Sequence, residues 1–216
     1  MMKKNGFTLA EVLITLAIIG VVATMTLPAL ISNTGEQQAK TGLKKGINTL
    51  TEAATMNQAI DGFDYASLTS ENTTDPEAQS LFGLLTKRTS VDYSKTGNGT
   101  LPTIKAGQAT SSNFAVFFRD GSAVLFDPAS TLTTATGVSD MEDDNMIHGV
   151  RVIYDTNGAK GPNILSNCAG TANGAEDAST NTCTPKTRVI KDQFGVRLRG
   201  GVAVPNGPVA RWAFEN

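Results

Sequence analysis

The stretch KKNGFTLAEVLITLAIIGVVATMTLPAL, residues 3–30, decides the architecture of this 216-residue chain. Residues 12–31 carry no charged side chain. A helix of about 20 residues rises about 30 Å, which matches the hydrocarbon thickness of a bilayer. Lys3 and Lys4 precede the apolar run and no basic cluster follows it closely. The positive-inside rule therefore places the N-terminus in the cytoplasm and the bulk of the chain outside it.

Two common kinds of N-terminal segment share this pattern: a secretory signal peptide that is cut off, and a plain uncleaved anchor. Neither explains Glu11, a carboxylate at the front of the apolar run, where a charge is costly. The end of the run also lacks a small-residue cleavage site, because large residues occupy the positions that need small ones.

The segment KKNGFTLAE, residues 3–11, resembles the class III signal of type IV pilins and type II secretion pseudopilins. The shared pattern is a short basic leader that ends in Gly6, then Phe7, Thr8, Leu9, a variable residue and Glu11, and then a long apolar stretch. The resemblance implies that prepilin peptidase cleaves after Gly6 and that the new terminus, Phe7, is N-methylated. Residues 1–6 would then be the leader, and residues 7–31 the transmembrane and filament-core segment.

The resemblance also implies a role for Glu11. Cleavage creates an α-amine on Phe7, and a cationic amine attracts a carboxylate strongly where the dielectric constant is low. An isolated buried charge is costly, whereas a paired charge is tolerated. In a filament the partner of Glu11 would be the amine of a neighbouring subunit, so that Glu11 recruits subunits and sets their axial register.

The second half of the helix, residues 32–62, is expected to pack on a globular head. Its apolar residues at positions 39, 43, 47, 50 and 54 recur every three or four residues and so share one face. Gly42 and Gly46 would allow another backbone to approach closely. Pro28 removes a backbone donor and is expected to kink or melt the helix near residues 24–28. The helix should end near residues 60–62.

Residues 63–216 are expected to form a head with an antiparallel sheet of about four or five strands, so that the chain is α+β. Asp120-Gly121 between residues 114–118 and 122–126 predicts a hairpin. A strand at residues 149–155 and a hairpin over residues 194–205 would complete the sheet. A short helix is expected around residues 76–86.

Other candidate sites are few. Cys168 and Cys183 are the only cysteines, and outside the cytoplasm they are expected to form a disulfide. Asp155 and Asn157 before Gly158 suggest either ordinary turn chemistry or, with Asp192, oxygen ligands for calcium, as in related pseudopilins. The chain lacks the common motifs of hydrolases and nucleotide-binding enzymes, so no enzyme activity is expected. A net charge of −2 argues against specific binding of nucleic acid.

These features favour a structural subunit of a type IV pilus-like filament that polymerises with itself through its N-terminal helix. The alternatives are a pseudopilin of a type II secretion pseudopilus and a membrane-anchored binding ectodomain that does not polymerise. The expected partners are prepilin peptidase and an inner-membrane assembly machinery with an ATPase. The subunit is expected in the inner membrane before assembly and in an extracellular or periplasmic filament afterwards.

Overall fold

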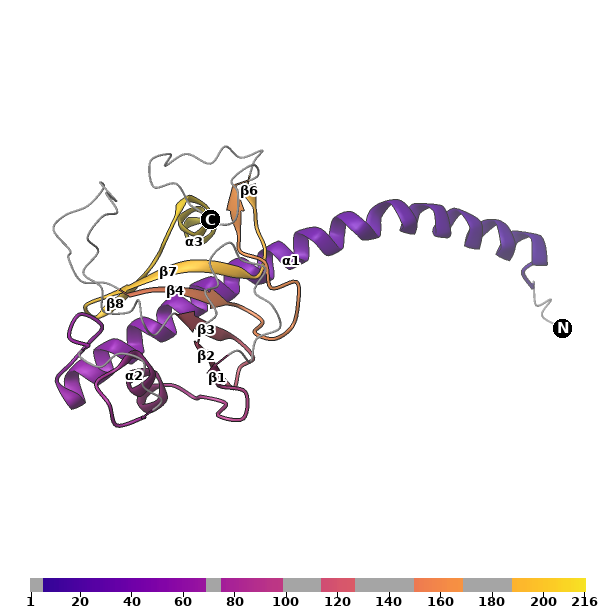
Figure 1. Cartoon of the computed structure of the whole chain (residues 1–216). Coiled ribbons are helices and arrows are strands. Elements are labelled where there is room, and N and C mark those ends of the chain that lie inside the picture. The colour runs from indigo at the N-terminus through magenta and orange to yellow at the C-terminus, as the bar shows by residue number, and fades with distance from the viewer. Residues whose placement is uncertain (1–5, 69–74, 99–113, 127–149, 169–187) are drawn as a thin grey trace. The chain divides into compact units, whose positions relative to one another are not determined.

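The computed structural model describes residues 6–68, 75–98, 114–126, 150–168 and 188–216, without the side chains of residues 28–33 and 151. The chain divides into two compact units. Met1–Gln38 is called the stem below, and Ala39–Asn216 is called the head. A long N-terminal helix followed by an antiparallel sheet confirms the α+β class that the sequence predicts (Figure 1).

A single helix, α1 (Leu9–Asp61), begins in the stem and ends in the head. It ends where Gly62 takes a φ of 78°, a conformation that glycine adopts without strain after the last helical turn. The predicted end of the helix is therefore confirmed. The helix continues without a break through residues 24–28, so it does not melt there, whereas the alternative, a kink near these residues, stays a prediction. A single proline removes only one hydrogen bond from a helix of 53 residues.

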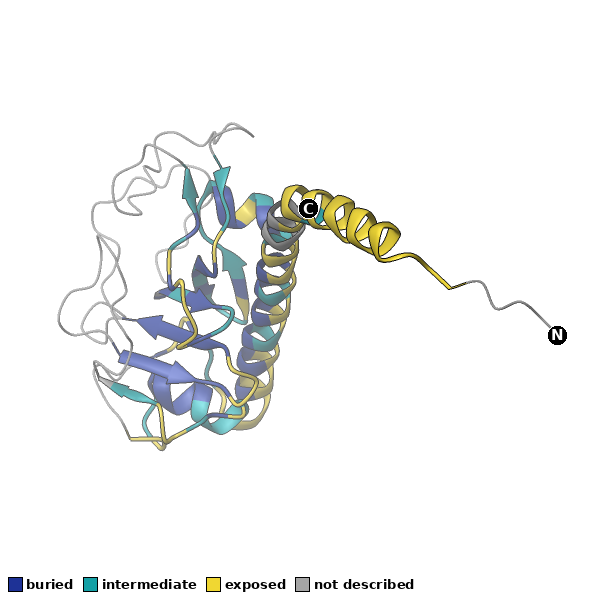
Figure 2. Ribbon diagram, turned by 90° about the vertical axis from the view of Figure 1, so that its right-hand side faces the viewer, coloured by how far each residue is buried: buried dark blue, intermediate teal, exposed yellow. Residues whose placement is uncertain are grey.

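The part of α1 in the head buries the apolar stripe that the sequence predicts. Ala39, Leu43, Ile47, Leu50 and Ala54 are each at most 7% exposed. They belong to the main hydrophobic core, together with residues of the sheet and of α2 (Leu81–Arg88). Figure 2 shows the buried and exposed sides of this helical segment. Packing against the sheet, rather than helix propensity, thus holds this part of α1 in place.

Two glycines let the helix approach the sheet. A Cβ atom on Gly46 would overlap the ring of Tyr154, and one on Gly42 would lie 2.8 Å from Cβ of Thr156. Both contacts come from β4 (Val150–Asp155) and the turn after it. The close approach that the sequence predicts at these glycines is confirmed.

The main sheet has six strands, in the order β1-β2-β3-β4-β7-β8, and all neighbours are antiparallel. The strands not yet bounded are β1 (Gly97–Asn98), β2 (Phe114–Phe117), β3 (Ala123–Phe126), β7 (Gln193–Arg199) and β8 (Val202–Pro205). Both predicted hairpins and the predicted strand are present. Gly121 and Gly200 supply the positive φ values, 94° and 54°, that their turns require.

β2 and β3 are buried at every position, which explains their continuous apolar sequences. Alternate side chains point to opposite faces of a sheet. Phe114, Val116, Val124 and Phe126 join the main core under α1. Ala115, Phe117, Ala123 and Leu125 form a second buried cluster, with Ile153 packed against it.

Three small elements complete the head. α2 begins after Ser80, whose hydroxyl accepts the Gly83 N–H at 3.0 Å. The sequence predicts a helix around residues 76–86, and α2 overlaps the second half of that range and ends two residues beyond it. β5 (Asn167–Cys168) and β6 (Arg188–Val189) pair as a separate two-stranded ribbon. The C-terminal helix α3 (Pro208–Glu215) was not expected from the sequence.

Candidate assembly site at the start of the helix

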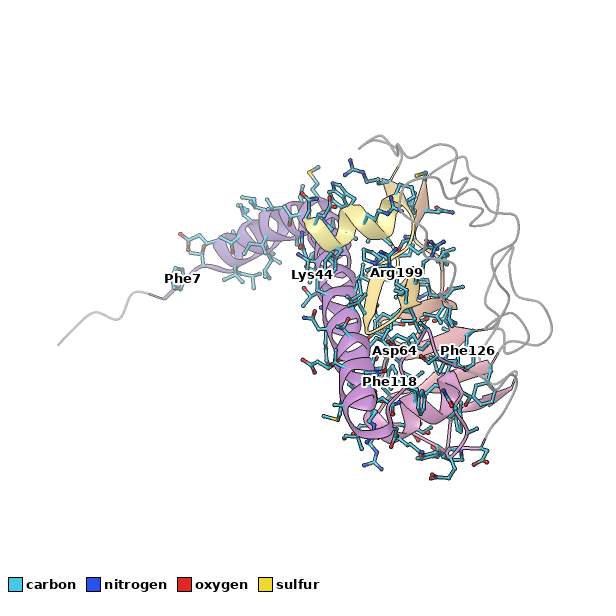
Figure 3. The ribbon with its side chains drawn as sticks, turned by 90° about the vertical axis from the view of Figure 1, so that its left-hand side faces the viewer. Phe7, Lys44, Asp64, Phe118, Phe126 and Arg199 are labelled. Atoms are coloured by element: carbon cyan, nitrogen blue, oxygen red, sulfur yellow. The ribbon has the colours of Figure 1, made fainter. Side chains whose placement is uncertain are left out.

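The bond between Gly6 and Phe7 lies in a segment that is neither helix nor strand. Both residues are exposed, and the Phe7 side chain is 90% exposed (Figure 3). A peptidase binds its substrate in an extended form, so an exposed, irregular segment in front of a helix is suited to cleavage. The chemistry of the class III signal is therefore placed where an enzyme could reach it.

Thr8 and Glu11 form a reciprocal cap at the N-terminus of α1. The Thr8 N–H and hydroxyl both donate to Oε2 of Glu11, at 2.8 and 2.9 Å, and the Glu11 N–H donates to the Thr8 hydroxyl at 3.3 Å. This is the capping-box arrangement of a Thr followed three residues later by a Glu. The sequence pattern T-x-x-E at residues 8–11 carries the signal for this cap, in addition to the assembly role that the resemblance implies for Glu11.

The capping box leaves part of the Glu11 carboxylate open to a partner. Among the described residues, both bonds to this group reach Oε2, and none reaches Oε1. A carboxylate oxygen can accept more than one hydrogen bond. Glu11 can therefore stabilise its own helix and still accept a hydrogen bond from another molecule at Oε1.

The candidate membrane span, Leu9–Leu27, follows directly. It has 19 residues with a mean hydropathy of 2.2, and none of it is buried in the structure. Its hydroxyls donate to carbonyls of the preceding turn: Thr15 to Val12, Thr24 to Val21 and Thr26 to Val22, at 2.8–3.1 Å. The three hydroxyl groups of the span are thus satisfied within the helix, as a hydrocarbon environment requires. An exposed apolar surface of this length needs lipid or neighbouring helices around it.

The predicted disulfide is not tested. Cys168 ends β5 and lies opposite Arg188 of β6. Cys183 lies outside the described residues. The pairing of Cys168 with Cys183 therefore stays a prediction.

The candidate calcium ligands lie close together at the end of β4 and the start of β7. Asp155 is fully buried, and its Oδ1 accepts the N–H groups of Asn157 and Gly158 at 3.0 and 2.7 Å. Its Oδ2 accepts Nε2 of Gln193 at 2.9 Å. Burial raises the pKa of Asp155 to about 6, and the nearby negative charge of Asp192 adds to the increase.

Asp192 organises the neighbouring loop rather than sharing hydrogen bonds with Asp155. Its carboxylate accepts the backbone N–H groups of Asn163 and Ile164, at 2.7 and 2.9 Å. Two amide oxygens in this cluster, Oδ1 of Asn157 and Oε1 of Gln193, are buried and accept no hydrogen bond from any described residue. Among the described residues, no three acidic, His or Cys side chains gather in a metal-binding group. The calcium site stays a prediction.

Comparison with protein-family models matches residues 1–27 to the prokaryotic N-terminal methylation motif. Comparisons with curated proteins and with solved structures gave no match. The matched residues include the basic leader, which lies outside the described residues, and the three features described above: the exposed Gly6–Phe7 bond, the capping box and the apolar span. The chain thus begins with the class III signal of type IV pilins and pseudopilins, at residues 1–27.

Proposed function

We propose that this chain is a structural subunit of a type IV pilus-like filament. Prepilin peptidase removes residues 1–6, Phe7 is N-methylated, and the mature subunit polymerises through the stem. The single observation that carries the proposal is the combination at one helix start: an exposed Gly6–Phe7 bond, a capped Glu11 and a wholly exposed apolar span.

The exposed span explains why the subunit would need a partner after it leaves the membrane. In water, burial of apolar area contributes about 25 cal/mol per Å², whereas helices already in lipid gain no hydrophobic driving force from association. Transfer of the span from lipid to the centre of a filament is therefore nearly balanced. An assembly machinery driven by ATP would supply the work of extraction.

Glu11 would supply specificity rather than bulk cohesion. The mature α-amine on Phe7 is a cation that does not exist in the uncut chain. When it meets Glu11 of a neighbouring subunit in a low-dielectric filament core, each charge is neutralised by the other. Because each subunit offers both the Phe7 amine and Glu11, the pairing would repeat from subunit to subunit with the same rise along the filament axis.

Two alternatives keep the same N-terminal chemistry. A pseudopilin of a type II secretion system would use the same cleavage and packing in a periplasmic filament. A membrane-anchored binding ectodomain would keep the span in lipid and never polymerise. The first differs from the main proposal in its assembly machinery, and the second in what Glu11 does.

Glu11→Ala tests the proposal, with Glu11→Gln as the matched variant that keeps the length and loses the charge. Both variants should insert in the membrane normally and fail to appear in sheared filaments. Mass spectrometry of the mature N-terminus should find a methylated Phe7. Unchanged filaments with Glu11→Ala, or a mature protein that still begins with residues 1–6, would overturn the proposal.

The head supports two further proposals of smaller scope. Cys168 and Cys183 would close a disulfide, which alkylation and mass spectrometry without reductant would detect as two blocked thiols. Asp155, Asn157 and Asp192 would bind Ca²⁺, since the two unpartnered amide oxygens of this cluster are of the type that calcium prefers. A calcium-dependent rise in melting temperature that Asp192→Asn abolishes would support the site, and no change on addition of calcium or EDTA would exclude it.

A further inference from the structure

One end of the head carries basic side chains from α1, β6 and α3 and from two segments that connect strands. We propose that this end binds the anionic phospholipid head groups of the membrane that holds the stem. The proposal rests on the membrane-embedded stem proposed above, but on neither cleavage nor polymerisation. The patch, called the basic collar below, consists of Lys44, Lys160, Arg188, Lys191 and Arg211.

Packing contacts place the members of the basic collar at one end of the head, where α1 enters it. Thr156 lies against Gly42 of α1, which brings the turn that contains Lys160 to this end. The Lys191 N–H donates to Ser166 at 2.9 Å in the segment beside β5. Figures 1 and 2 show β6 and α3 at this same end and α2 at the other.

A stack of three side chains fixes the position of α3. Nζ of Lys40 and Cζ of Arg188 lie 4.0 and 4.2 Å from the ring centroid of Trp212. Lys40 belongs to the first turn of α1 in the head, and Arg211 is exposed beside Trp212 on α3. Arg211 is therefore held near the entry of α1. Figure 3 shows Lys44 on α1 at this end of the head.

The charges of the basic collar are not neutralised within the described part of the chain. None of its five members lies within ion-pairing distance of a described acidic side chain. At the other end of the head the pattern is reversed: Lys87 pairs with Glu77, Arg88 with Asp61 and Lys95 with Asp92. Among the described residues, the acidic groups near the collar are Glu215, which is exposed, Asp120, which is paired with Lys45, and Asp155 and Asp192, which are buried.

The length of the connecting segment limits how far the basic collar can lie from the membrane. The apolar sequence ends at residue 31 and the head begins at residue 39, so that only residues 32–38 separate them. As a helix these residues span about 10 Å, and the polar layer of one leaflet is about 5–7 Å thick. The gap is comparable with the screening length of about 8 Å at physiological salt. Long Lys and Arg side chains can cover the rest of the distance.

Anionic lipid suits the basic collar better than the acidic end of another copy. Three of the acidic side chains described at that end, Asp61, Glu77 and Asp92, are already in ion pairs, and a second copy would have to break these pairs to use them. A membrane surface rich in anionic head groups offers unpaired charge at no such cost. Each basic residue near such a surface contributes an attraction worth about a fivefold change in the docking equilibrium.

Trp212, the only tryptophan of the chain, lies within the stack that borders the basic collar and serves as a reporter. The full-length protein is placed at one copy per nanodisc, in phosphatidylcholine alone or with phosphatidylglycerol, with a trace of lipid that carries a nitroxide quencher on its head group. We expect stronger quenching of Trp212 in the anionic discs at 0.15 M salt and loss of the difference at 1 M salt.

Charge reversal identifies the surface. Lys191→Glu and Arg211→Glu should each weaken docking in anionic discs by at least about fivefold. The matched control is Lys95→Glu, which reverses a charge of the same kind at the other end of the head and should leave quenching unchanged. Near-UV circular dichroism confirms that each variant is folded.

Three results would overturn the proposal: equal quenching in both kinds of disc, equal effects of Lys95→Glu and the two collar variants, or a difference that appears only with two copies per disc. The last would assign the basic collar to contact between copies. Because the discs require neither cleavage nor a filament, a failure here leaves the proposed function intact. A failure of the Glu11 experiment likewise leaves this result standing.

Discussion

Gly46 offers a sharp test of how α1 packs in the head. Gly46→Ala has two opposing effects on the free energy of unfolding. It removes a glycine from a helix interior, which stabilises by about 1 kcal/mol. It also introduces a Cβ atom that overlaps the ring of Tyr154, a side chain that is only 2% exposed and belongs to a central strand.

The overlap should win. Overpacking of a core typically costs about 1–3 kcal/mol, and here the added carbon meets three ring atoms at once, so a cost at or above the upper end is expected. The net result is a destabilisation of about 2 kcal/mol, which corresponds to a melting temperature lower by about 4–8 °C for a domain of this size. Asn48→Ala is the matched control, because it places the same residue two positions away on an exposed part of the helix.

The assay is urea denaturation of the full-length protein in detergent, followed by the fluorescence of Trp212, which reports on the head alone. Asn48→Ala should be stabilised by a few tenths of a kcal/mol through helix propensity. The double variant Gly46→Ala with Tyr154→Val should cost less than the two single variants together, because the smaller side chain leaves room for the new carbon. A Gly46→Ala protein as stable as Asn48→Ala would refute the packing described for this helix.

Three other predictions concern single groups. Because the pKa of Asp155 is raised to about 6 in the folded head from an ordinary 3.8, the folded state binds the proton more tightly, so stability should rise by about 1 kcal/mol as pH falls from about 7 to 5. Chemical denaturation across this range should show that Asp155→Asn removes the slope, and a slope that persists contradicts the prediction. Lys40→Met keeps the apolar part of the side chain but removes the cation over Trp212. It should lower the free energy of unfolding by about 1 kcal/mol in the same denaturation assay. An unchanged free energy of unfolding would mean that the cation over Trp212 contributes nothing to stability. Thr8→Val removes both hydroxyl bonds of the capping box, and should therefore lower the helicity at the start of α1 and the yield of sheared filaments. Thr8→Ser keeps the hydroxyl and should keep the helicity and the yield. Equal filament yields from the two variants would mean that assembly does not depend on the capping box.

The features that sequence reasoning predicted well are those that a local pattern determines. The apolar stripe, the two hairpins and the end of α1 each follow from residue spacing or from a glycine at a turn. The span at the N-terminus follows from length and hydropathy. In each case the residues that carry the signal are neighbours in sequence, so no tertiary contact is needed to interpret them.

The features that were missed depend on partners far along the chain. Lys40 lies outside the apolar stripe in the sequence, yet it is 6% exposed and stacks on Trp212 of α3. Nothing near Lys40 in the sequence announces that contact. α3 itself has only eight residues. The one sequence signal for its start is the proline that follows Gly207, and a single proline is weak evidence for a helix. The ribbon of β5 and β6 is too short for periodicity to show.

The capping box changes the meaning of the acidic residue in the span. A subunit that waits in the bilayer does not hold an orphan charge, because the donors of Thr8 already accompany it into the apolar layer. Pairing with the amine of a neighbouring subunit, as proposed above, would use Oε1 and leave the two Thr8 bonds at Oε2 in place. The start of the helix would then stay capped both in the membrane and in a filament. Return of a subunit to the membrane would therefore cost the ion pair but not the cap.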